Sequence, residues 1–409
     1  MVRVGSALLV PLIFAACATP TAAPVPDAGN DAASPSLDAE ALDAPTRDAA
    51  TLDSGFVSAA HPAWPTVPDQ GGPILAHPQL VVVTYAGFAF ASDVEAYASW
   101  IVGSRWLTTV GAEYGVGAGA VVANVRLTET APATLSETEL GAHLGELIAS
   151  GDLPTPSMGL SSALYVVYLP RTTRVTDAGG GGTTAVSCAD FLGDHRAATS
   201  GSGSTFAFAV IPDCIETDVG LTELEGMLEA MSHELVEAAT DPFPDHPAWA
   251  FPATSSSEWI AAGGEIGDLC VGARTTEDGH EVQRIWSNAA ALAGLDPCVP
   301  GAPSAPFFDV SPSVNGVRMV SPGEVVDVTL TGWSTAPTSP WTTEAYAYGD
   351  FDTAPTLSAH TFTNGSVATL TLHVPTSATS GATSTTSVYS YMGAFDGIYS
   401  FWPVVVRVR

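Results

Sequence analysis

The chain contains no lysine. All 12 of its basic residues are arginine, against 43 acidic residues, so its formal net charge is −31. Lysine and arginine carry most contacts to nucleic-acid phosphates, and we therefore predict no nucleic-acid partner. The missing lysine also excludes a P-loop and a pyridoxal Schiff base. A surface this acidic favours cations, divalent metals included.

Long apolar runs are scarce, and one stands at the N-terminus. Arg3 precedes "ALLVPLIFAA", which ends in small residues and Cys17. This run is too short to cross a bilayer as a stable helix and is typical of a removed signal peptide. Phe14-Ala15-Ala16-Cys17 resembles a bacterial lipobox, which implies that Cys17 becomes a lipid-bearing N-terminus. The alternative is a plain secretory peptide in which Cys17 is incidental.

In either case we predict an exported protein. With the lipid, it is held at the periplasmic face or cell surface, and it touches the membrane only through the N-terminal anchor. The predicted organisation is a lipoprotein signal peptide (1–17), a disordered tether rich in Ala, Asp and Pro (18–57), an α/β or α+β domain (58–300) and an all-β domain (301–409).

The chain has only five cysteines. If Cys17 carries lipid, four remain, and an even number in an exported chain predicts two disulfides. Spacing leaves all three pairings open, although Cys188 with Cys214 and Cys270 with Cys298 close the shortest loops. No CxxC pair is present, so a cysteine zinc site is not expected.

Strand-like and helix-like segments alternate between residues 78 and 240. Buried strands are predicted from their β-branched runs at 78–88, 120–129, 163–170 and 204–214. Helices are predicted at 92–115, at 136–151, where Ser136 and Glu139 form a capping-box pattern, and at 221–240. Past residue 300, alternation such as "VDVTLTGW" with Ser, Thr, Gly and Pro punctuation predicts an immunoglobulin-like β-sandwich.

The helix at 221–240 contains His233-Glu234-Leu235-Val236-Glu237, which is the HExxH pattern of zinc peptidases with Glu at the second His. Helical spacing predicts a core stripe formed by Leu224, Leu228, Met231, Leu235 and Ala238. The same spacing predicts a solvent-facing side formed by Glu225, Glu229, Ser232 and Thr240.

His233 and Glu237 are four residues apart and share one flank with Gly226 and Ala230. Small residues on that flank indicate either that another segment packs closely there or that a cleft opens. A metal held there would place Glu234 where the HExxH base holds the attacking water. The ordinary alternative is an acidic surface pair, since His and Glu at this spacing are common on helices.

Two further segments offer ligands. "GGEIGDLC" supplies Glu265 and Asp268, whose alternative role is a turn with a helix cap. Asp241 before Pro242 most simply ends the helix, while His246 follows it. His195, near a predicted disulfide, is a lone histidine that either faces the site or is structural.

The ordered set "SHELVEAATDP", "GEIGDLC" and "IWSNAAALAGLDPC" resembles the EXORDIUM or phosphate-induced protein 1 family, including its bacterial relatives, over residues 78–299. The resemblance implies a disulfide between Cys270 and Cys298. It also implies a centre of His233, Glu234 and Glu237 completed by Glu265 or Asp268. Plant members act in cell-wall growth and signalling, and their His-Glu helix is similar to that of zincin metallopeptidases.

We therefore expect a zincin-like domain that binds one divalent metal. Zinc is favoured by one imidazole with carboxylates, namely His233, Glu237 and Asp268, with Glu265 as the other candidate. Glu234 would be the general base for amide hydrolysis of a peptide or cell-wall polymer. The alternative is an adhesion or carbohydrate-binding lipoprotein, with a vestigial or structural metal site, that uses the aromatic residues of the β-sandwich.

Overall fold

The computed structural model describes residues 55–178, 184–214, 220–252, 255–301, 305–313 and 315–409. The predicted signal peptide, Cys17 and nearly all of the predicted tether lie outside the described residues. Val57–Arg409 form one compact unit, so the division predicted near residue 300 stays a prediction. No helix in the described ranges combines the length and apolar character that crossing a membrane requires.

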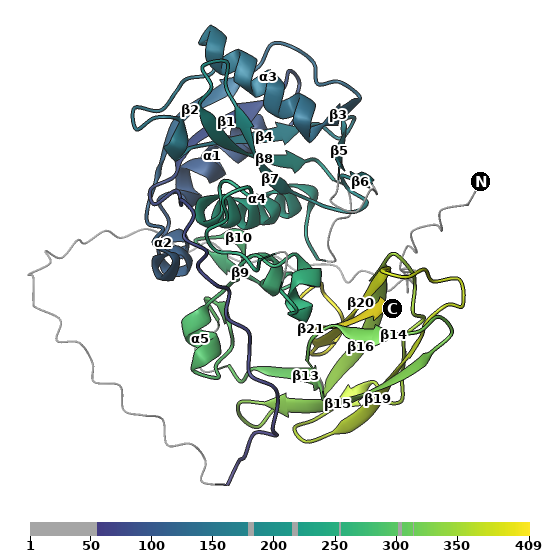
Figure 1. The fold of residues 1–409 in the computed structure, drawn as a ribbon. Coiled ribbons are helices and arrows are strands. Elements are labelled where there is room, and N and C mark those ends of the chain that lie inside the picture. Colours follow the sequence, from purple (N-terminus) through teal and green to yellow (C-terminus); the bar gives the residue numbers. More distant parts are fainter. Residues whose placement is uncertain (1–54, 179–183, 215–219, 253–254, 302–304, 314) are drawn as a thin grey trace, which may run out of the picture. The chain divides into compact units, whose positions relative to one another are not determined.

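Helices and strands alternate up to residue 300, which confirms a mixed α/β arrangement (Figure 1). In chain order the elements are β1 Gln79–Thr84, α1 Ala91–Ile101, α2 Arg105–Gly111, η1 Ala112–Tyr114, β2 Ala120–Arg126, β3 Thr134–Ser136, α3 Glu137–Ser150, η2 Leu160–Ser162, β4 Ala163–Leu169, β5 Arg174–Ala178, β6 Thr184–Val186, β7 Asp194–Thr199, β8 Thr205–Pro212, α4 Glu223–Thr240, η3 Glu258–Ala262, η4 Asp268–Cys270, β9 Arg274–Glu277, β10 His280–Gln283, β11 Ile285–Trp286, α5 Asn288–Leu292 and β12 Cys298–Val299.

The central sheet has the strand order β2-β1-β4-β8-β7. Neighbours among β2, β1, β4 and β8 are parallel, and β7 closes the edge antiparallel to β8. Helix α3 covers one face, whereas α1, α2 and α4 cover the other (Figure 1). In β4, Leu164 and Val166 face the α4 side while Tyr165 and Val167 face the α3 side. Burial on both faces explains the uninterrupted apolar run of this strand.

The helix predicted at 92–115 is divided in two. Helix α1 ends at Ile101, and Ser104 then caps α2 by accepting a hydrogen bond from the Leu107 N–H at 3.0 Å. The Ser104 hydroxyl also donates to the carbonyl of Ile101 at 2.8 Å. One side chain thus satisfies backbone groups of both helix ends, which a periodicity argument overlooks. The capping box of Ser136 and Glu139 at the start of α3 is confirmed.

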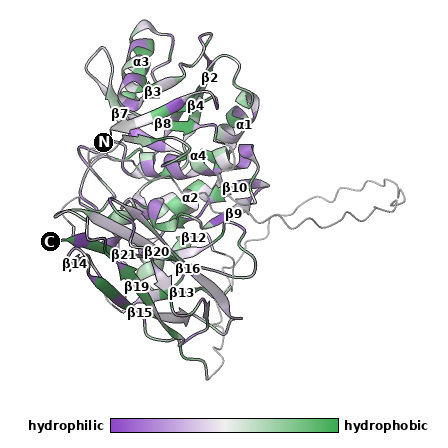
Figure 2. Ribbon diagram, turned by 90° about the vertical axis from the view of Figure 1, so that its right-hand side faces the viewer, coloured by the Kyte–Doolittle hydropathy of each residue, from purple (hydrophilic) through white to green (hydrophobic). Residues whose placement is uncertain are grey.

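Helix α4 is buried on more than its predicted core stripe. The stripe is covered as expected at Leu228, Met231, Leu235 and Ala238. The prediction of a solvent-facing side was wrong, because three of its members are also buried: Glu229, Ser232 and Thr240. Strand β10 covers that side, and its Gln283 N–H donates to the Ser232 hydroxyl at 2.9 Å. Figure 2 shows hydrophilic and hydrophobic residues mixed along this covered helix.

After residue 305 the described chain is all β. Its strands are β13 Phe308–Pro312, β14 Arg318–Val320, β15 Val325–Ser334, β16 Trp341–Gly349, β17 Thr356–Leu357, β18 Thr361–Phe362, β19 Val367–His373, β20 Thr383–Tyr391 and β21 Ser400–Val408. They form two sheets, β13-β15-β19-β17 and β14-β21-β20-β16-β18, around one apolar core. A β-sandwich-like part is therefore present, and its immunoglobulin-like type stays a prediction.

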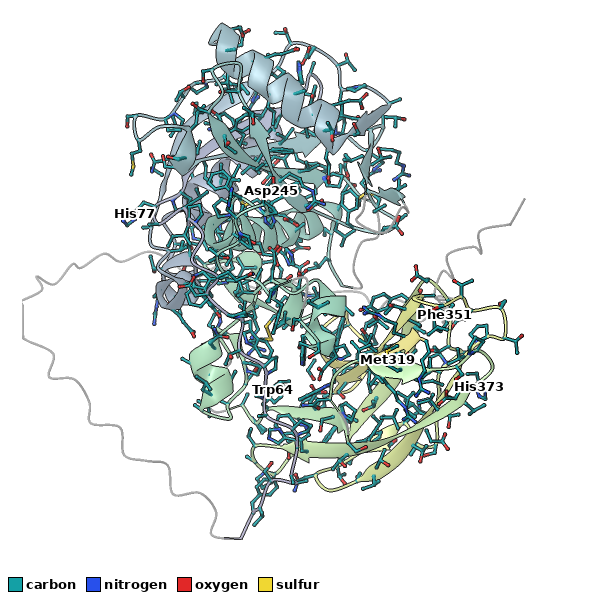
Figure 3. All side chains as sticks on the ribbon, in the orientation of Figure 1. Trp64, His77, Asp245, Met319, Phe351 and His373 are labelled. Carbon is teal, nitrogen blue, oxygen red and sulfur yellow. A yellow bond between two sulfur atoms is a disulfide. The ribbon has the colours of Figure 1, made fainter. Side chains whose placement is uncertain are left out.

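An aromatic cluster joins this part to the preceding chain. Trp64, labelled in Figure 3, stacks on Trp402 of β21 with ring centroids 4.7 Å apart. It also contacts Trp286 of β11 and Trp333 of β15, each at 5.5 Å. Buried tryptophans are large apolar surfaces, so this cluster contributes to holding the compact unit together.

The two predicted disulfides are present. Cys188 pairs with Cys214, and Cys270 pairs with Cys298. These are the shortest-loop pairings, and the second is the one that the family resemblance implied. Two disulfides are typical of an exported protein.

Candidate metal centre

Helix α4 carries the His-Glu motif to one end of the central sheet. It begins with a capping box, in which the Thr222 hydroxyl accepts from the Glu225 N–H and the Glu225 carboxylate accepts from the Thr222 N–H. It ends at Asp241, whose backbone N–H donates to the Glu237 carbonyl at 2.6 Å. Both ends are thereby fixed, which sets the direction in which His233 and Glu237 project.

His233 is held by Gln283 of β10. Its Nδ1 lies 3.0 Å from the Gln283 side-chain oxygen, and the Gln283 amide nitrogen donates to the Gly267 carbonyl at 2.7 Å. This second bond sets the orientation of the Gln283 amide, so its oxygen faces His233. Because that oxygen can only accept, His233 Nδ1 carries the proton. The Nε2 atom then faces carboxylates, 3.1 Å from Glu237 and 3.8 Å from Asp268.

His195 of β7 lies in the same cluster. Its Nε2 is 3.1 Å from the Asp241 carbonyl and 3.5 Å from Glu265. Its Nδ1 is 3.4 Å from Glu234 and 3.8 Å from Glu237. The sequence left this histidine's role open, because nothing local shows that a β7–β8 hairpin would place it beside α4.

Glu237 connects the parts of the centre. Its Oε1 accepts the backbone N–H groups of Gly267 and Asp268 at 3.1 and 3.0 Å. Its Oε2 faces both His233 and His195. Because the two N–H groups occupy Oε1, Glu237 Oε2 is the oxygen that is available to a cation.

Glu234 is buried between the two histidines, with its side chain 5% exposed. Oε1 lies 4.0 Å from His233 Nε2, and Oε2 lies 3.4 Å from His195 Nδ1 without a hydrogen bond of normal geometry. Gly193 packs so closely that a Cβ there would come within 2.6 Å of Glu234. A buried carboxylate oxygen without a donor lacks the compensation that such a group needs in a protein interior.

Glu265 lies in the turn that precedes η4, and Asp268 is the first residue of η4. The Asp268 carboxylate accepts the Glu265 N–H at 3.2 Å, as in the predicted turn, and also faces His233. The Glu265 Oε2 faces His195 and has no hydrogen bond of normal geometry. Their side chains are 20% and 23% exposed, so they lie on the more open side of the centre.

The carboxylates raise the pKa values of the two histidines. Burial by itself lowers the pKa of His195, but the charges of Glu265, Glu234 and Glu237 outweigh it and hold that pKa well above its usual value. Burial likewise lowers the pKa of His233, and Glu237 and Glu234 are foremost among the charges that raise it well above its usual value. Without a metal, both rings therefore hold a second proton.

The pKa values of the carboxylates are shifted in different directions. Burial is the main cause that raises the pKa of Glu265 well above its usual value and the pKa of Asp268 to about 8. Burial also acts on Glu237, but His233 and His195 outweigh it, and the pKa of Glu237 is lowered. The bridging carboxylate is thus the most strongly ionised of the three.

Two groups of side chains have the spacing of metal ligands. His233, Glu237 and Asp268 bring ligand atoms within 4.8 Å of one another, and so do His195, Glu237 and Glu265. Imidazole nitrogen with carboxylate oxygen is a donor set that binds zinc and other divalent transition metals. The residues present therefore fit a divalent cation, and the structure brings together His233, Glu237, Asp268 and Glu265, the residues predicted as ligands.

Two other sequence candidates are not brought to the centre as ligands. The Asp241 carboxylate accepts the Ala248 N–H at 3.1 Å, and only its backbone carbonyl approaches His195. His246 is exposed in the turn after α4, next to Asp245, which Figure 3 labels. The simpler interpretation of Asp241, as a helix end, is the one that the structure supports.

A cavity of about 300 Å³ lies elsewhere, among the Cys270–Cys298 disulfide, Trp64 and the sandwich aromatics Phe307, Tyr399 and Phe401. Its lining includes Leu269, the residue after Asp268. None of the His and carboxylate side chains of the metal centre lines it. This cavity and the charged centre are therefore separate features.

Comparison with known proteins adds no assignment. No family model matches the chain, and no curated protein matches it. Among solved structures it is similar to the periplasmic chaperone SfaE (9% identity over 25% of this chain and 56% of the chaperone, TM-score 0.19). It is also similar to a PapD-like domain of human CEP192 (11%, 25% and 83%, TM-score 0.17).

A third similarity is to a nucleoside hydrolase-related hypothetical protein from Saccharophagus degradans (12% identity, 46% of this chain and 48% of that protein, TM-score 0.21). The chain spans about half the length of this protein and of the chaperone. At these TM-scores the likenesses assign neither fold nor function.

Proposed function

We propose that this chain is an exported, lipid-anchored protein with a zincin-like His-Glu helix that binds a divalent metal, zinc foremost, and hydrolyses amide bonds. The observation that carries the proposal is the convergence of His233, Glu237 and Asp268. Three separate elements supply the ligands and their supports, namely α4, η4 and β10. A surface His-Glu pair would not need buried partners on both sides.

The residues have distinct roles in this proposal. A divalent cation bound there would polarise a substrate carbonyl and lower the pKa of a water molecule. Glu234 accepts the proton of the attacking water at a carboxylate oxygen and passes it to the leaving amine. Gln283 keeps the His233 ring oriented, and the Gly267 and Asp268 N–H groups orient Glu237.

The substrate class follows from the location and the charge. An exported protein anchored by lipid meets extracellular peptides and cell-wall polymers, and a net charge of −31 disfavours polyanions. Replacing the second His of HExxH by Glu adds negative charge at the metal. This weakens the polarisation of the carbonyl, so slow turnover or a narrow substrate range is expected.

The test is Glu234→Gln in the full-length chain. The substitution preserves side-chain size while removing the base. We expect zinc content to stay at the parent level and peptidase turnover to fall about 10²–10⁴-fold. His143→Ala, which changes a partly exposed histidine of α3 outside the metal centre, is the matched control and should keep both zinc content and turnover at the parent level. A parent chain that binds no zinc, or a Glu234→Gln variant with full turnover, would overturn the proposal.

The second candidate function is carbohydrate binding by the β-sandwich. Tyr346 and Tyr348 of β16 are exposed with their rings nearly parallel. The rings of Tyr389 and Tyr391 of β20 are also nearly parallel, but these two side chains are partly buried. Such stacked rings suit a sugar-binding face. Other aromatic residues of the β-sandwich are buried and do not form such a face: Trp333, Trp341 and Trp402. In this case Glu234→Gln would leave polysaccharide binding unchanged and no turnover would be found in the parent.

A further inference from the structure

The metal centre contains two ligand groups that share one residue. His233, Glu237 and Asp268 form the first, and His195, Glu237 and Glu265 form the second. Each group has its own histidine and its own further carboxylate. Zinc-type ions take ligands at about 2.0–2.3 Å, so ligand atoms within 4.8 Å of one another need only small movements to surround an ion.

We propose that this centre holds two divalent cations, an outer ion between His233, Glu237 and Asp268 and an inner ion between His195, Glu237 and Glu265. The inference rests on the proposed metal site but not on the proposed hydrolysis. It extends that site, because one divalent metal was all that the sequence predicted. It also gives His195 a role as a ligand.

Both histidines are oriented as metal ligands are. His195 directs Nε2 to the Asp241 carbonyl at 3.1 Å, and His233 directs Nδ1 to the Gln283 side-chain oxygen at 3.0 Å. A ligating histidine commonly donates its second N–H to such a carbonyl, which leaves the other nitrogen for the metal. Those other nitrogens face Glu237, at 3.8 Å from His195 Nδ1 and 3.1 Å from His233 Nε2. Glu265 lies on the other side of the His195 ring, 3.5 Å from Nε2, so its carboxylate must turn toward Nδ1 to bind the same ion.

Glu237 is built to bridge. Backbone N–H groups of Gly267 and Asp268 fix its Oε1, so Oε2 is the oxygen directed at both histidines. A carboxylate anchored on one side and shared on the other is a suitable link between two adjacent ions. A single ion at His233 would leave His195 and Glu265 without a metal partner although their ligand atoms also converge on Glu237.

The charge of the centre agrees with two ions. Two imidazoles and four carboxylates meet there. The carboxylates are those of Glu234, Glu237, Glu265 and Asp268. With neutral imidazoles and all four carboxylates ionised, one divalent cation leaves a formal charge of about −2 in a largely buried site, whereas two cations balance the carboxylates. The Glu234 Oε2 atom is buried without a hydrogen bond and lies 3.4 Å from His195 Nδ1, so a cation beside His195 would compensate its charge.

The experiment is metal stoichiometry on the full-length chain, purified without chelator and loaded with Zn²⁺ or Mn²⁺. We expect about two equivalents in the parent, about one in His195→Ala and in His233→Ala, and weakened binding of both ions in Glu237→Gln. With Mn²⁺, electron paramagnetic resonance should show a spin-coupled pair in the parent and an isolated ion in each histidine variant. His143→Ala is the surface control and should match the parent.

The outcomes separate this inference from the proposed function. One equivalent in the parent, kept in His195→Ala, would overturn the second ion and leave the single-metal hydrolase standing. Two equivalents that persist in His195→Ala, or that show no spin coupling, would place the second ion elsewhere and also overturn it. Two coupled ions without hydrolysis would support the pair and count against the hydrolase. If His195→Ala fails to fold by circular dichroism, His195→Gln, which retains more of the side-chain volume, replaces it.

Discussion

At the scale of single residues, the centre depends on backbone groups as much as on side chains. The Glu237 carboxylate accepts hydrogen bonds from the backbone N–H groups of Gly267 and Asp268. The Gln283 side-chain amide donates to the Gly267 carbonyl, which fixes its orientation. The i, i+4 spacing was sufficient to predict that His233 and Glu237 share a flank. It was insufficient to predict these supports, because they come from residues about thirty or more positions away.

Gly267→Ala tests the role of this turn. The φ of Gly267 is −76°, which any residue adopts, so only the space around a new Cβ matters. That Cβ would come within 2.7 Å of Glu237 Oε1 and 3.0 Å of the His233 ring. Either the turn or the Glu237 carboxylate must shift, and both movements disturb the hydrogen bonds that orient Glu237. We expect zinc affinity to fall about 10–100-fold, measured by competition with a chelating dye.

Gly103→Ala is the matched control, because nothing lies within 4 Å of its new Cβ. Its zinc affinity should equal that of the parent. Unchanged affinity in Gly267→Ala as well would show that the turn does not support the metal ligands. A loss of folding, seen by circular dichroism, would be distinguished from a loss of affinity by measuring both on the same samples.

At the scale of elements, the sequence predicted what local signals determine. The strands β1, β2, β4 and β8, the capping box of α3 and the two-sheet region after residue 305 all follow from periodicity and turn residues. Edge strand β7 was not predicted, and with it the position of His195 was left open. Its sequence, DHRAAT, has weak alternation, and its pairing with β8 is what places it beside α4.

The error on α4 has the same origin. A helical wheel assumes one buried face, but β10 covers a second face of this helix. Ser232, predicted to face solvent, is completely buried. It donates to the Glu229 carbonyl at 2.6 Å and accepts the Gln283 N–H at 2.9 Å. A serine is compatible with either face, so the sequence alone did not distinguish them.

Ser232→Ala tests this contact between elements. Removing the hydroxyl leaves the buried Gln283 N–H without its acceptor, since Gln283 is itself buried. We expect the free energy of unfolding to fall by about 1–3 kcal/mol, measured by urea denaturation. Ser150→Ala, in an exposed position at the end of α3, is the control and should change it little. Equal stabilities of the two variants would contradict the assigned anchoring role of Ser232.

At the scale of the whole molecule, the dominant property is an excess of acidic groups that includes the metal centre. Several carboxylates there are buried beside two histidines rather than solvated. Such an arrangement holds either protons or cations, because unpaired buried charge is unfavourable. The stability of the protein should therefore depend jointly on pH and on divalent metal.

The pH dependence has a definite sign. In the folded, metal-free chain, burial raises the pKa of Asp268 to about 8, whereas an unfolded aspartate titrates near about 3.9. The pKa values of His195 and His233 also stand well above the value of about 6.5 in the unfolded state, because neighbouring carboxylates outweigh burial. Above neutral pH the folded chain thus binds more protons than the unfolded chain, so its stability falls as pH rises.

Metal replaces these protons, so the metal-loaded chain should escape that loss. We expect the melting temperature of the chelator-treated chain to fall between about pH 6.5 and about pH 8.5, and the stabilisation by Zn²⁺ to increase over the same range. Differential scanning calorimetry at several pH values, with and without Zn²⁺, measures both.

Asp268→Asn is the informative variant, because it cannot release the proton that Asp268 holds up to about pH 8. It should flatten the loss in the metal-free state and weaken the gain from Zn²⁺. A metal-free melting temperature that rises with pH would contradict the assignment, since it would mean that these groups hold no protons that the metal displaces.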